Sequence, residues 1–485
     1  MNKELRRLSI VILVMFLALF GATSWIQVVQ AEALSENPRN TRALYDSYQV
    51  QRGAILAEGA AIAYSVPSDD IYSFQRVYTD AEMWAPVTGY INPMLGSATG
   101  LEAAMNQELS GSSGSAFFQR VEQIFTGQTP RGSNVSISLD PQVQRAAYDA
   151  LGDLQGAVLA IEPDTGRVLA MVSSPSFDTN LLAVHDDAAV TETYAALEAD
   201  PLDPLGNRAI AGALNPPGST FKLVVASAAL ASGEYTPEST FDNPARWQLP
   251  GSSDSISNSG GGTCGPGETV TLATALALSC NIPMAQLAVQ LGDNAIREEA
   301  EKYGFNSSFE LPLVSTASTY PRALDDAQTA LSGFGQGDVR ATPLQMAMVS
   351  AGVANEGVVM NPRMVDRVIG PDLSTQQVFE DSEFQRALSE EDAATMTQMM
   401  VANVRDGIAS GARIEGVEVA GKTGTAENGP DDPYTLWFTG FAPAEDPQVA
   451  VAVVIEDGGG LGQSGLSNRI AAPIGKAVME AVLNG

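Results

Sequence analysis

The sequence predicts an α+β protein built on one antiparallel sheet with flanking helices and a large helical insert. Apolar strand patterns occur in two sets that are far apart in the chain, one near residue 160 and one beyond residue 417. The stretch between about 185 and 410 has mostly helical periodicity. We therefore expect strands from both ends to form the sheet, with the helical block inserted between them. A small N-terminal module and one membrane helix precede this domain.

The predicted strands are short apolar runs bounded by turn residues. Asp164-Thr165-Gly166 separates two such runs and predicts a hairpin. An amphipathic pattern near the C-terminus predicts a closing helix. The expected strands are 156–161, 167–172, 417–426, 437–441 and 449–455, and the closing helix covers 470–483.

The N-terminus carries a charge-free run from Leu8 to Ala31, preceded by Lys3, Arg6 and Arg7. About twenty apolar residues span a bilayer, and the positively charged flank stays on the cytoplasmic side. We expect residues 1–31 to be an uncleaved anchor that crosses the cell membrane once and leaves the rest of the chain outside the cytoplasm. A cleaved signal peptide is the alternative, because small residues occur at 31–33.

Residues 32–150 are polar and interrupted by turns, and they predict a pedestal or protein-contact module without a catalytic constellation. Short strands are expected at 52–57 and 134–139. Asp140 can cap a helix that has Pro141 at its first position. We expect residues 151–485 to form a second, larger domain.

Composition excludes several classes of function. A net charge of −31 argues against a nucleic-acid partner, because phosphate would be repelled. One His and two Cys are too few for a dedicated His/Cys metal site. The sequence also has no phosphate-binding loop or dinucleotide fingerprint in a strand-to-helix context.

The most informative stretch is Pro216-Pro217-Gly218-Ser219-Thr220-Phe221-Lys222. The prolines and the glycine precede an apolar run that predicts a buried helix, with Ser219 in its first turn. A spacing of three residues places Lys222 over Ser219 on one helix face. A buried amine has a lowered pKa and can activate a serine. The alternative base is His185, the only His in the chain, which lies in an acidic loop.

Two further motifs fit a cleft between the sheet and the helical insert. Ser279-Cys280-Asn281 interrupts two predicted helices, and Gly421-Lys422-Thr423-Gly424-Thr425 lies on a predicted strand whose glycines allow a substrate backbone to approach. Taken alone, the first could be a simple helix cap and the second a glycine-weakened edge strand. We expect both motifs to meet Ser219 in the cleft.

Together these motifs resemble the triplet of the β-lactamases and penicillin-binding proteins, with Cys280 where the middle motif has Asp. They occur in the expected order, about 60 and 140 residues apart. Nearly the whole chain resembles class B penicillin-binding proteins, closest to the actinobacterial penicillin-binding protein A group, although the N-terminal module is short. The resemblance implies the penicillin-binding/β-lactamase-like transpeptidase fold. Further resemblance lies in 207–209, 335–337, 342–345 and 437–441.

The resemblance also implies a peptidoglycan D,D-transpeptidase that cross-links stem peptides ending in D-Ala-D-Ala. Ser219 would be the nucleophile and Lys222 its base. Ser279 would relay a proton with help from the charge of Lys422, and Asn281 would hold Lys222 and the substrate amide. The backbone N–H groups of Ser219 and Thr425 would form the oxyanion hole. The substrate carboxylate would be bound by Lys422, Thr423, Gly424 and Thr425.

The same resemblance implies that β-lactams acylate Ser219 and that no metal or cofactor takes part. A glycan polymerase of the SEDS class is an implied partner. A D,D-carboxypeptidase or β-lactamase-type hydrolase remains an alternative, because water and an amine attack the same acyl-enzyme. A non-catalytic divisome scaffold is a second alternative, although such a protein should have lost a key Ser, Lys or Asn.

Cys264 and Cys280 are the only cysteines, and outside the cytoplasm two cysteines usually pair. A bridge between them would close a loop of about 15 residues, worth roughly 3 kcal/mol in the chain-entropy model. It would hold residues 251–263 against the Ser279-Cys280-Asn281 turn. The alternative is two free thiols.

Overall fold

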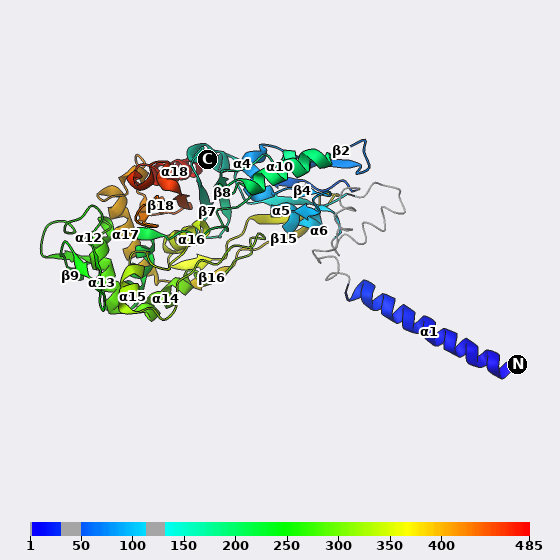
Figure 1. Cartoon of the computed structure of the whole chain (residues 1–485), viewed down its shortest axis with the longest axis horizontal. Coiled ribbons are helices and arrows are strands. Elements are labelled where there is room, and N and C mark those ends of the chain that lie inside the picture. Colours follow the sequence, from blue (N-terminus) through cyan, green and yellow to red (C-terminus); the bar gives the residue numbers. More distant parts are fainter. Residues whose placement is uncertain (1, 31–49, 113–130) are drawn as a thin grey trace.

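The computed structural model of the protein describes residues 2–30, 50–112 and 131–485 (Figure 1). The side chains of helix α1 (Asn2–Val28) are exposed from residue 3 to residue 27, apart from the half-buried Ser24. Its segment Lys3–Gln27 is long and apolar enough to cross a membrane, and no other helix in these three ranges is. The predicted anchor is thus a continuous helix. The alternative cleavage site at 31–33 lies outside the described residues.

The predicted antiparallel sheet is present and joins strands from both ends of the catalytic domain. Its order is β17-β18-β19-β7-β8, and every neighbouring pair is antiparallel. This confirms the fold class, including the hairpin at Asp164-Thr165-Gly166. The strands are β7 (Gly156–Ile161), β8 (Val168–Ser174), β17 (Ala420–Ala426), β18 (Thr435–Ala442) and β19 (Val449–Ile455).

Helices cover both faces of this sheet, because its central strands β7 and β19 are apolar on both faces. In β7, Leu159 belongs to one hydrophobic core while Val158 and Ala160 belong to another, as the two-residue period of a strand requires. The Val158 face packs against α8 (Pro141–Leu151) and α18 (Ala471–Asn484). The Leu159 side of the sheet packs against α16 (Pro343–Ala354) and α17 (Glu390–Arg405), and α11 (Lys222–Ala231) belongs to the same hydrophobic core and packs on α17.

The inserted region contains the predicted helices and, in addition, strands that the sequence analysis did not predict. Helices α12 to α15 gather at the end of the body opposite the N-terminal module (Figure 1). They are α12 (Leu272–Ala277), α13 (Asn281–Leu291), α14 (Asp293–Lys302) and α15 (Asp326–Ser332). Two further helices, α9 (Asn180–Ala183) and α10 (Asp187–Ala199), precede them. The short strands are β9 (Thr240–Asp242), β10 (Trp247–Gln248), β11 (Ser255–Ile256), β12 (Thr269–Thr271), β13 (Val358–Met360), β14 (Val365–Ile369), β15 (Thr375–Val378) and β16 (Glu383–Arg386).

The N-terminal module is a second sheet that borrows two of these strands. Its order is β15-β14-β6-β1-β2-β3, with β14 antiparallel to β6 and β6 parallel to β1. A prediction of mostly helix for 185–410 was therefore incomplete, because β14 and β15 are short and β14 is stabilised by a partner strand, β6, that lies far away in the sequence. The module's own elements are β1 (Ile55–Ala57), β2 (Ala60–Pro67), β3 (Phe74–Tyr78), β4 (Ile91–Asn92), β5 (Ser97–Ala98), β6 (Asn134–Ile137), α4 (Ala81–Thr88), α5 (Gly100–Ala104) and α6 (Asn106–Leu109).

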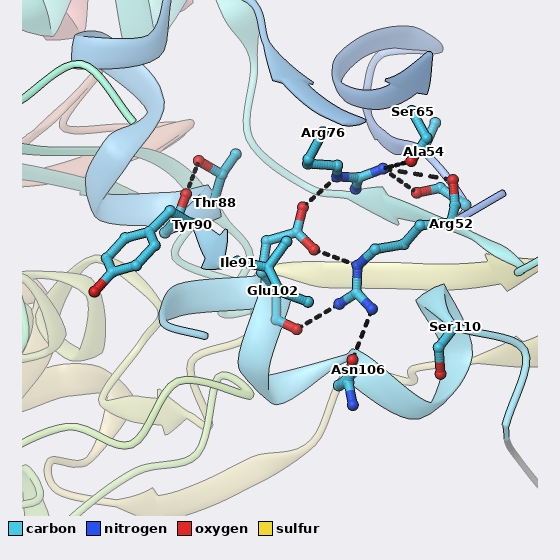
Figure 2. Close-up of polar contacts among 12 residues, drawn as sticks. Arg52, Ala54, Ser65, Arg76, Thr88, Tyr90, Ile91, Glu102, Asn106 and Ser110 are labelled. Atoms are coloured by element: carbon cyan, nitrogen blue, oxygen red, sulfur yellow. Dashed lines mark hydrogen bonds and ion pairs between the residues drawn. The ribbon is translucent and has the colours of Figure 1, made fainter. Parts of the chain in front are cut away.

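A buried ionic network ties this module together. Figure 2 shows the Glu102 carboxylate between two guanidinium groups, and each of them donates to it through Nε at 2.6 Å, Arg52 to Oε2 and Arg76 to Oε1. Arg76 also donates to the backbone oxygen of Gly53 at 2.8 Å. All three charged side chains are buried. Burial alone would raise the pKa of Glu102, but the charges of Arg76 and Arg52 outweigh burial and lower it.

Candidate active site

Ser219 lies in a 3-10 turn, η2 (Gly218–Phe221), that leads directly into α11. The sequence analysis placed Ser219 in the first turn of the helix, and the structure shows that this first turn has 3-10 geometry, with the α-helical part beginning at Lys222. The turn packs closely on β17. A Cβ at Gly218, whose φ is +53°, would lie 2.7 Å from the backbone oxygen of Thr425, and a Cβ at Gly424 would lie 2.7 Å from that of Pro217. Glycine at both positions therefore lets Ser219 and the end of β17 approach one another.

Lys222 is fully buried and is bonded across the cleft. Its Nζ donates to the backbone oxygen of Ser279 at 2.7 Å and to Oδ1 of Asn281 at 2.9 Å. No hydrogen bond joins the side chains of Ser219 and Lys222, both of which the structure describes. The three-residue spacing does bring the two groups to the same end of α11. The two residues that hold the Lys222 amine, Ser279 and Asn281, lie instead where α12 ends and α13 begins.

Ser279 occupies that break and connects the two buried amines. Its φ of +57° is in the left-handed region, which is rare for a residue other than glycine and costs free energy. The strained backbone directs the hydroxyl oxygen to accept from Nζ of Lys422 at 2.6 Å and, more weakly, from Nζ of Lys222 at 3.4 Å. A proton can therefore pass from one amine to the other through Ser279.

Neither buried lysine has an acidic partner among the residues that the structure describes. Within the described residues, no salt bridge engages Lys222 or Lys422, and both side chains are fully buried. Burial and the nearby charge of Lys422 lower the pKa of Lys222 well below its ordinary value. Burial lowers the pKa of Lys422 to about 7. An amine with so low a pKa can accept a proton near neutral pH.

The predicted site residues converge on an open cleft of about 510 Å³. Thr423 lies at its base, and its hydroxyl is buried without a hydrogen-bond partner. Lys222 and Lys422 lie behind the wall, where they contact Ser279, and Gly424 packs against Pro217. The predicted residues that line the cleft are Ser219, Ser279, Asn281, Thr423 and Thr425.

The two backbone N–H groups that we expect to form the oxyanion hole, those of Ser219 and Thr425, lie where η2 and β17 approach one another. Ser219 is in the first turn of η2, where backbone N–H groups have no intrahelical partner. Among the described residues, this N–H also makes no backbone hydrogen bond to another element. Thr425 is at the opposite side of the same close approach, one residue before the end of β17.

Sequence reasoning missed two polar residues that support the site. The Oδ1 of Asn258 accepts from the backbone N–H of Asn281 at 2.9 Å, so it fixes the start of α13. Ser467 donates to the backbone oxygen of Gly424 and shares a hydrogen bond of 2.8 Å with the hydroxyl of Thr425. Both residues lie in irregular, polar segments, where no local pattern distinguishes them from ordinary loop residues.

The disulfide hypothesis agrees with the structure, in which Cys264 and Cys280 are bonded. The bridge lies immediately before Asn281 and joins residues 251–263 to the same turn that Asn258 supports. The alternative base, His185, is elsewhere. It contacts Asp70 and the ring of Tyr72 in the N-terminal module, so the structure does not place it at Ser219.

Comparison with protein families assigns the two parts of the chain. Residues 156–480 match the penicillin binding protein transpeptidase domain. The chain belongs to the penicillin-binding protein family. Residues 52–135 match the penicillin binding protein A dimerisation domain. The second match falls inside the module predicted for 32–150, and the exact domain boundaries stay a prediction.

Two mycobacterial proteins are similar over the whole length of the chain. The peptidoglycan D,D-transpeptidase PbpA of Mycolicibacterium smegmatis is 43% identical over 493 residues, covering 100% of this chain and 99% of the relative. The protein of the same name from Mycobacterium tuberculosis is 41% identical and is covered completely, as is this chain.

Solved structures agree with this family. The ceftriaxone acyl-enzyme complex of penicillin-binding protein A from M. tuberculosis has a TM-score of 0.87 and 41% identity, and the match covers 90% of this chain and 100% of that chain. The penicillin G acyl-enzyme complex of the same protein has a TM-score of 0.85 and 40% identity, with the same coverage.

Proposed function

We propose that this protein is a peptidoglycan D,D-transpeptidase that cross-links stem peptides ending in D-Ala-D-Ala through an acyl-enzyme on Ser219. One observation carries the proposal. Ser219 lines an open cleft at the start of the helix that supplies Lys222, which is fully buried and makes no salt bridge within the described residues. Hydrogen bonds to Ser279 connect Lys222 to a second buried lysine, Lys422. Family membership and the two acylated M. tuberculosis structures support the same chemistry.

In the acylation step, neutral Lys222 takes the proton of the Ser219 hydroxyl, whose oxygen attacks the carbonyl between the two D-Ala residues. The amine is 3.4 Å from Oγ of Ser279 and must move or act through a short relay to reach Ser219. Hydrogen bonds between catalytic groups are commonly long in a free enzyme and shorten only when substrate is bound. The backbone N–H groups of Ser219 and Thr425 donate hydrogen bonds to the carbonyl oxygen as it becomes negatively charged. Each such donor commonly lowers the activation barrier by about 3–4 kcal/mol.

Release of the terminal D-Ala requires a proton on its amine. Ser279 supplies it and is reprotonated through Lys222, while the charge of Lys422 favours the transfer. Lys422, Thr423 and Thr425 bind the terminal carboxylate, and Gly424 allows the peptide backbone to lie close to β17. Asn281 holds Lys222 and the substrate amide. The amine of a second stem peptide then attacks the ester and completes the cross-link.

The remaining parts of the chain fit this role. Helix α1 anchors the protein in the cell membrane by a single pass, with the catalytic domain outside the cytoplasm. β-Lactams acylate Ser219 in place of the donor peptide. The N-terminal module and the anchor are available for contact with a SEDS-class glycan polymerase. The reaction uses no metal or cofactor, and no nucleic acid is a partner.

Labelling with fluorescent penicillin tests the nucleophile. The wild-type full chain in detergent should form a stable fluorescent adduct, and Ser219→Ala should form none because the attacking oxygen is missing. Ser232→Ala is a matched control at the exposed end of α11 and should label like the wild type. Equal labelling of Ser219→Ala and wild type would overturn the assignment of Ser219.

A second measurement separates transpeptidation from the hydrolytic alternative. An acyl-D-Ala thioester is supplied with and without a D-amino acid acceptor. A transpeptidase should convert much of the acyl-enzyme into the amide product. If only the hydrolysed acid accumulates at every acceptor concentration, the carboxypeptidase function is favoured.

A further inference from the structure

Helix α13 begins at Asn281 without a local side-chain cap. The residue at the N-cap position, Cys280, makes no side-chain hydrogen bond to the helix, and its sulfur is bonded to Cys264. The first backbone N–H groups of a helix have no partner inside it, and an Asp, Asn or Ser at the N-cap normally accepts from this first turn. The start of α13, which carries Asn281 into the cleft, therefore depends on an acceptor from elsewhere in the chain.

Asn258 supplies that acceptor from a position 23 residues before Asn281. Its Oδ1 accepts from the backbone N–H of Asn281 at 2.9 Å and from that of Ile282 at 3.1 Å. Its Nδ2 donates to the backbone oxygen of Gly262 at 3.0 Å, and the side chain is buried. Because both ends of this amide are bonded to the protein's own backbone, Asn258 acts as a support for the wall of the cleft.

The same contact controls the side chain of Asn281. Its Oδ1 accepts from Nζ of Lys222 at 2.9 Å, and its Nδ2 donates to the backbone oxygen of Ser257 at 3.2 Å. Ser257 is the neighbour of Asn258, so the cap on α13 also fixes the position of the Ser257 carbonyl. These two bonds decide which way the Asn281 amide faces. If the carbonyl moved away, the amide could turn its NH₂ group toward Lys222, whose amine is itself a donor.

The segment on either side of Asn258 gives it little directional support. The glycines at 260–262 are exposed, and an added Cβ at any of them would have no atom within 4 Å. On the other side, Ile256 packs against a small apolar cluster, and such packing is not directional. Among the residues that the structure describes, three hydrogen bonds join 251–263 to α13, and all three come from Ser257 or Asn258.

We propose that Asn258 is a positioning residue for acyl transfer, which holds the Asn281 amide with its oxygen on Lys222 by capping α13. This inference rests on the proposed acylation of Ser219, and it adds a residue that acts on this step only through Asn281. Loss of Asn258 should slow acylation without abolishing it, because Lys222 keeps its hydrogen bond to the backbone oxygen of Ser279.

Penicillin acylation of the full chain in detergent tests the proposal, with the rate constant and the final labelled fraction measured separately. In Asn258→Ala the maximal rate constant should fall about 10- to 30-fold, because small displacements of catalytic groups cost this much, while the labelled fraction still reaches that of the wild type. A labelled fraction that falls while the rate constant stays at the wild-type value would show a merely structural role instead.

Asn258→Asp is the conservative variant, since Asp and Asn are about equally good helix caps and both keep the acceptor oxygen. At the optimum pH of each protein, it should recover the rate constant to within about threefold of the wild type. A rate constant as low as that of Asn258→Ala would contradict the role given to the acceptor oxygen.

Asn281→Ala makes the test specific, because it removes the side chain and keeps the backbone N–H that Asn258 caps. If Asn258 acts through the Asn281 amide, adding Asn258→Ala to Asn281→Ala should slow timed labelling by less than about twofold further. The cap itself is still lost in the double variant, so its effect on unfolding should remain. An additional loss of rate as large as in the wild-type background would overturn the inference.

Asn243→Ala is the matched control. Asn243 is also a buried Asn, and its side chain holds the backbone of Cys264 and Gly267, but no hydrogen bond joins it to α13 in the described residues. This variant should be acylated at about the wild-type rate, and a loss as large as in Asn258→Ala would also refute the proposal. Failure of the wild type to label with penicillin would instead overturn the proposed function, so the two failures are distinguishable.

Discussion

At the scale of single residues, the site depends on burying two amines without a carboxylate. Two ammonium groups near one another in a low-dielectric setting repel strongly, and the repulsion is relieved when one of them is neutral. Lys222 carries both burial and the charge of Lys422 against its protonated form, whereas Lys422 has burial alone. The arrangement assigns the base role to Lys222 and the cationic, carboxylate-binding role to Lys422.

The pH dependence of acylation should reflect this division. The rate constant for acylation by penicillin should rise with pH as Lys222 loses its proton, and it should fall above about 7 as Lys422 loses its charge. The profile of the second-order rate constant, measured by stopped-flow or by timed labelling, reports these groups in the free enzyme. Lys476→Gln, which changes a half-buried lysine on α18 that pairs with Glu480, should leave the profile unchanged. A rate that climbs steadily to pH 10 would contradict the assignment of lowered pKa values.

At the scale of elements, the site is formed where η2 meets the edge of β17. Neither element makes the site alone. The 3-10 turn presents Ser219, the strand presents Thr423 and Thr425, and the contact between them is so close that a single methyl group would separate them. Trp437 of β18 reinforces the contact, because its Nε1 donates to the backbone oxygen of Pro216 at 2.9 Å.

Gly218→Ala should therefore impair acylation more than stability. The new Cβ would lie 2.7 Å from the Thr425 oxygen and would push the nucleophile away from β17. Because a displacement of about 1 Å can cost a hundredfold in rate, we expect a loss of 10- to 100-fold in penicillin acylation. Gly233→Ala is the matched control, since Gly233 also has a positive φ, follows the same helix and has no atom within 4 Å of the added Cβ. Similar rates for the two variants would show that the close contact is dispensable.

At the scale of the whole molecule, the catalytic domain and the N-terminal module are joined by shared secondary structure. Strands β14 and β15, from residues 365–378, complete the module's sheet, and β6 lies between β14 and β1. A substitution that destabilises the N-terminal module should therefore also destabilise the catalytic domain. The Arg52–Glu102–Arg76 network is the place to test this, because a buried charge that loses its partner is strongly destabilising.

Glu102→Gln should lower the free energy of unfolding by about 3–5 kcal/mol, because two buried guanidinium groups lose their counter-charge. Urea unfolding followed by tryptophan fluorescence should show one transition, shifted as a whole. Glu58→Gln, at the exposed turn between β1 and β2, removes the same charge and should change stability little. A separate early transition in Glu102→Gln, with penicillin labelling intact, would show instead that the module unfolds independently.

Acid titration of the wild-type protein should also reveal how much the charged Glu102 contributes to the free energy of unfolding. Because the folded-state pKa of Glu102 is lowered from 4.5, its contribution is fully present above the unfolded value and is lost as the pH falls through the folded value.

The sequence by itself determined the parts of this protein that local chemistry encodes. Turn residues and apolar periodicity specified the β7–β8 hairpin, the Asp140 cap of α8, the α12–α13 break and the anchor helix, and the motifs identified the residues of the cleft. The tertiary structure alone decided which partners hold Lys222, how deeply the two lysines are buried, and that β14 and β15 join the N-terminal sheet. The physical reason is that residues adjacent in sequence specify local conformation. Burial, pKa values and long-range hydrogen bonds depend instead on segments that meet only when the whole chain packs. Ser279 and Lys422, which are 143 residues apart, are an example.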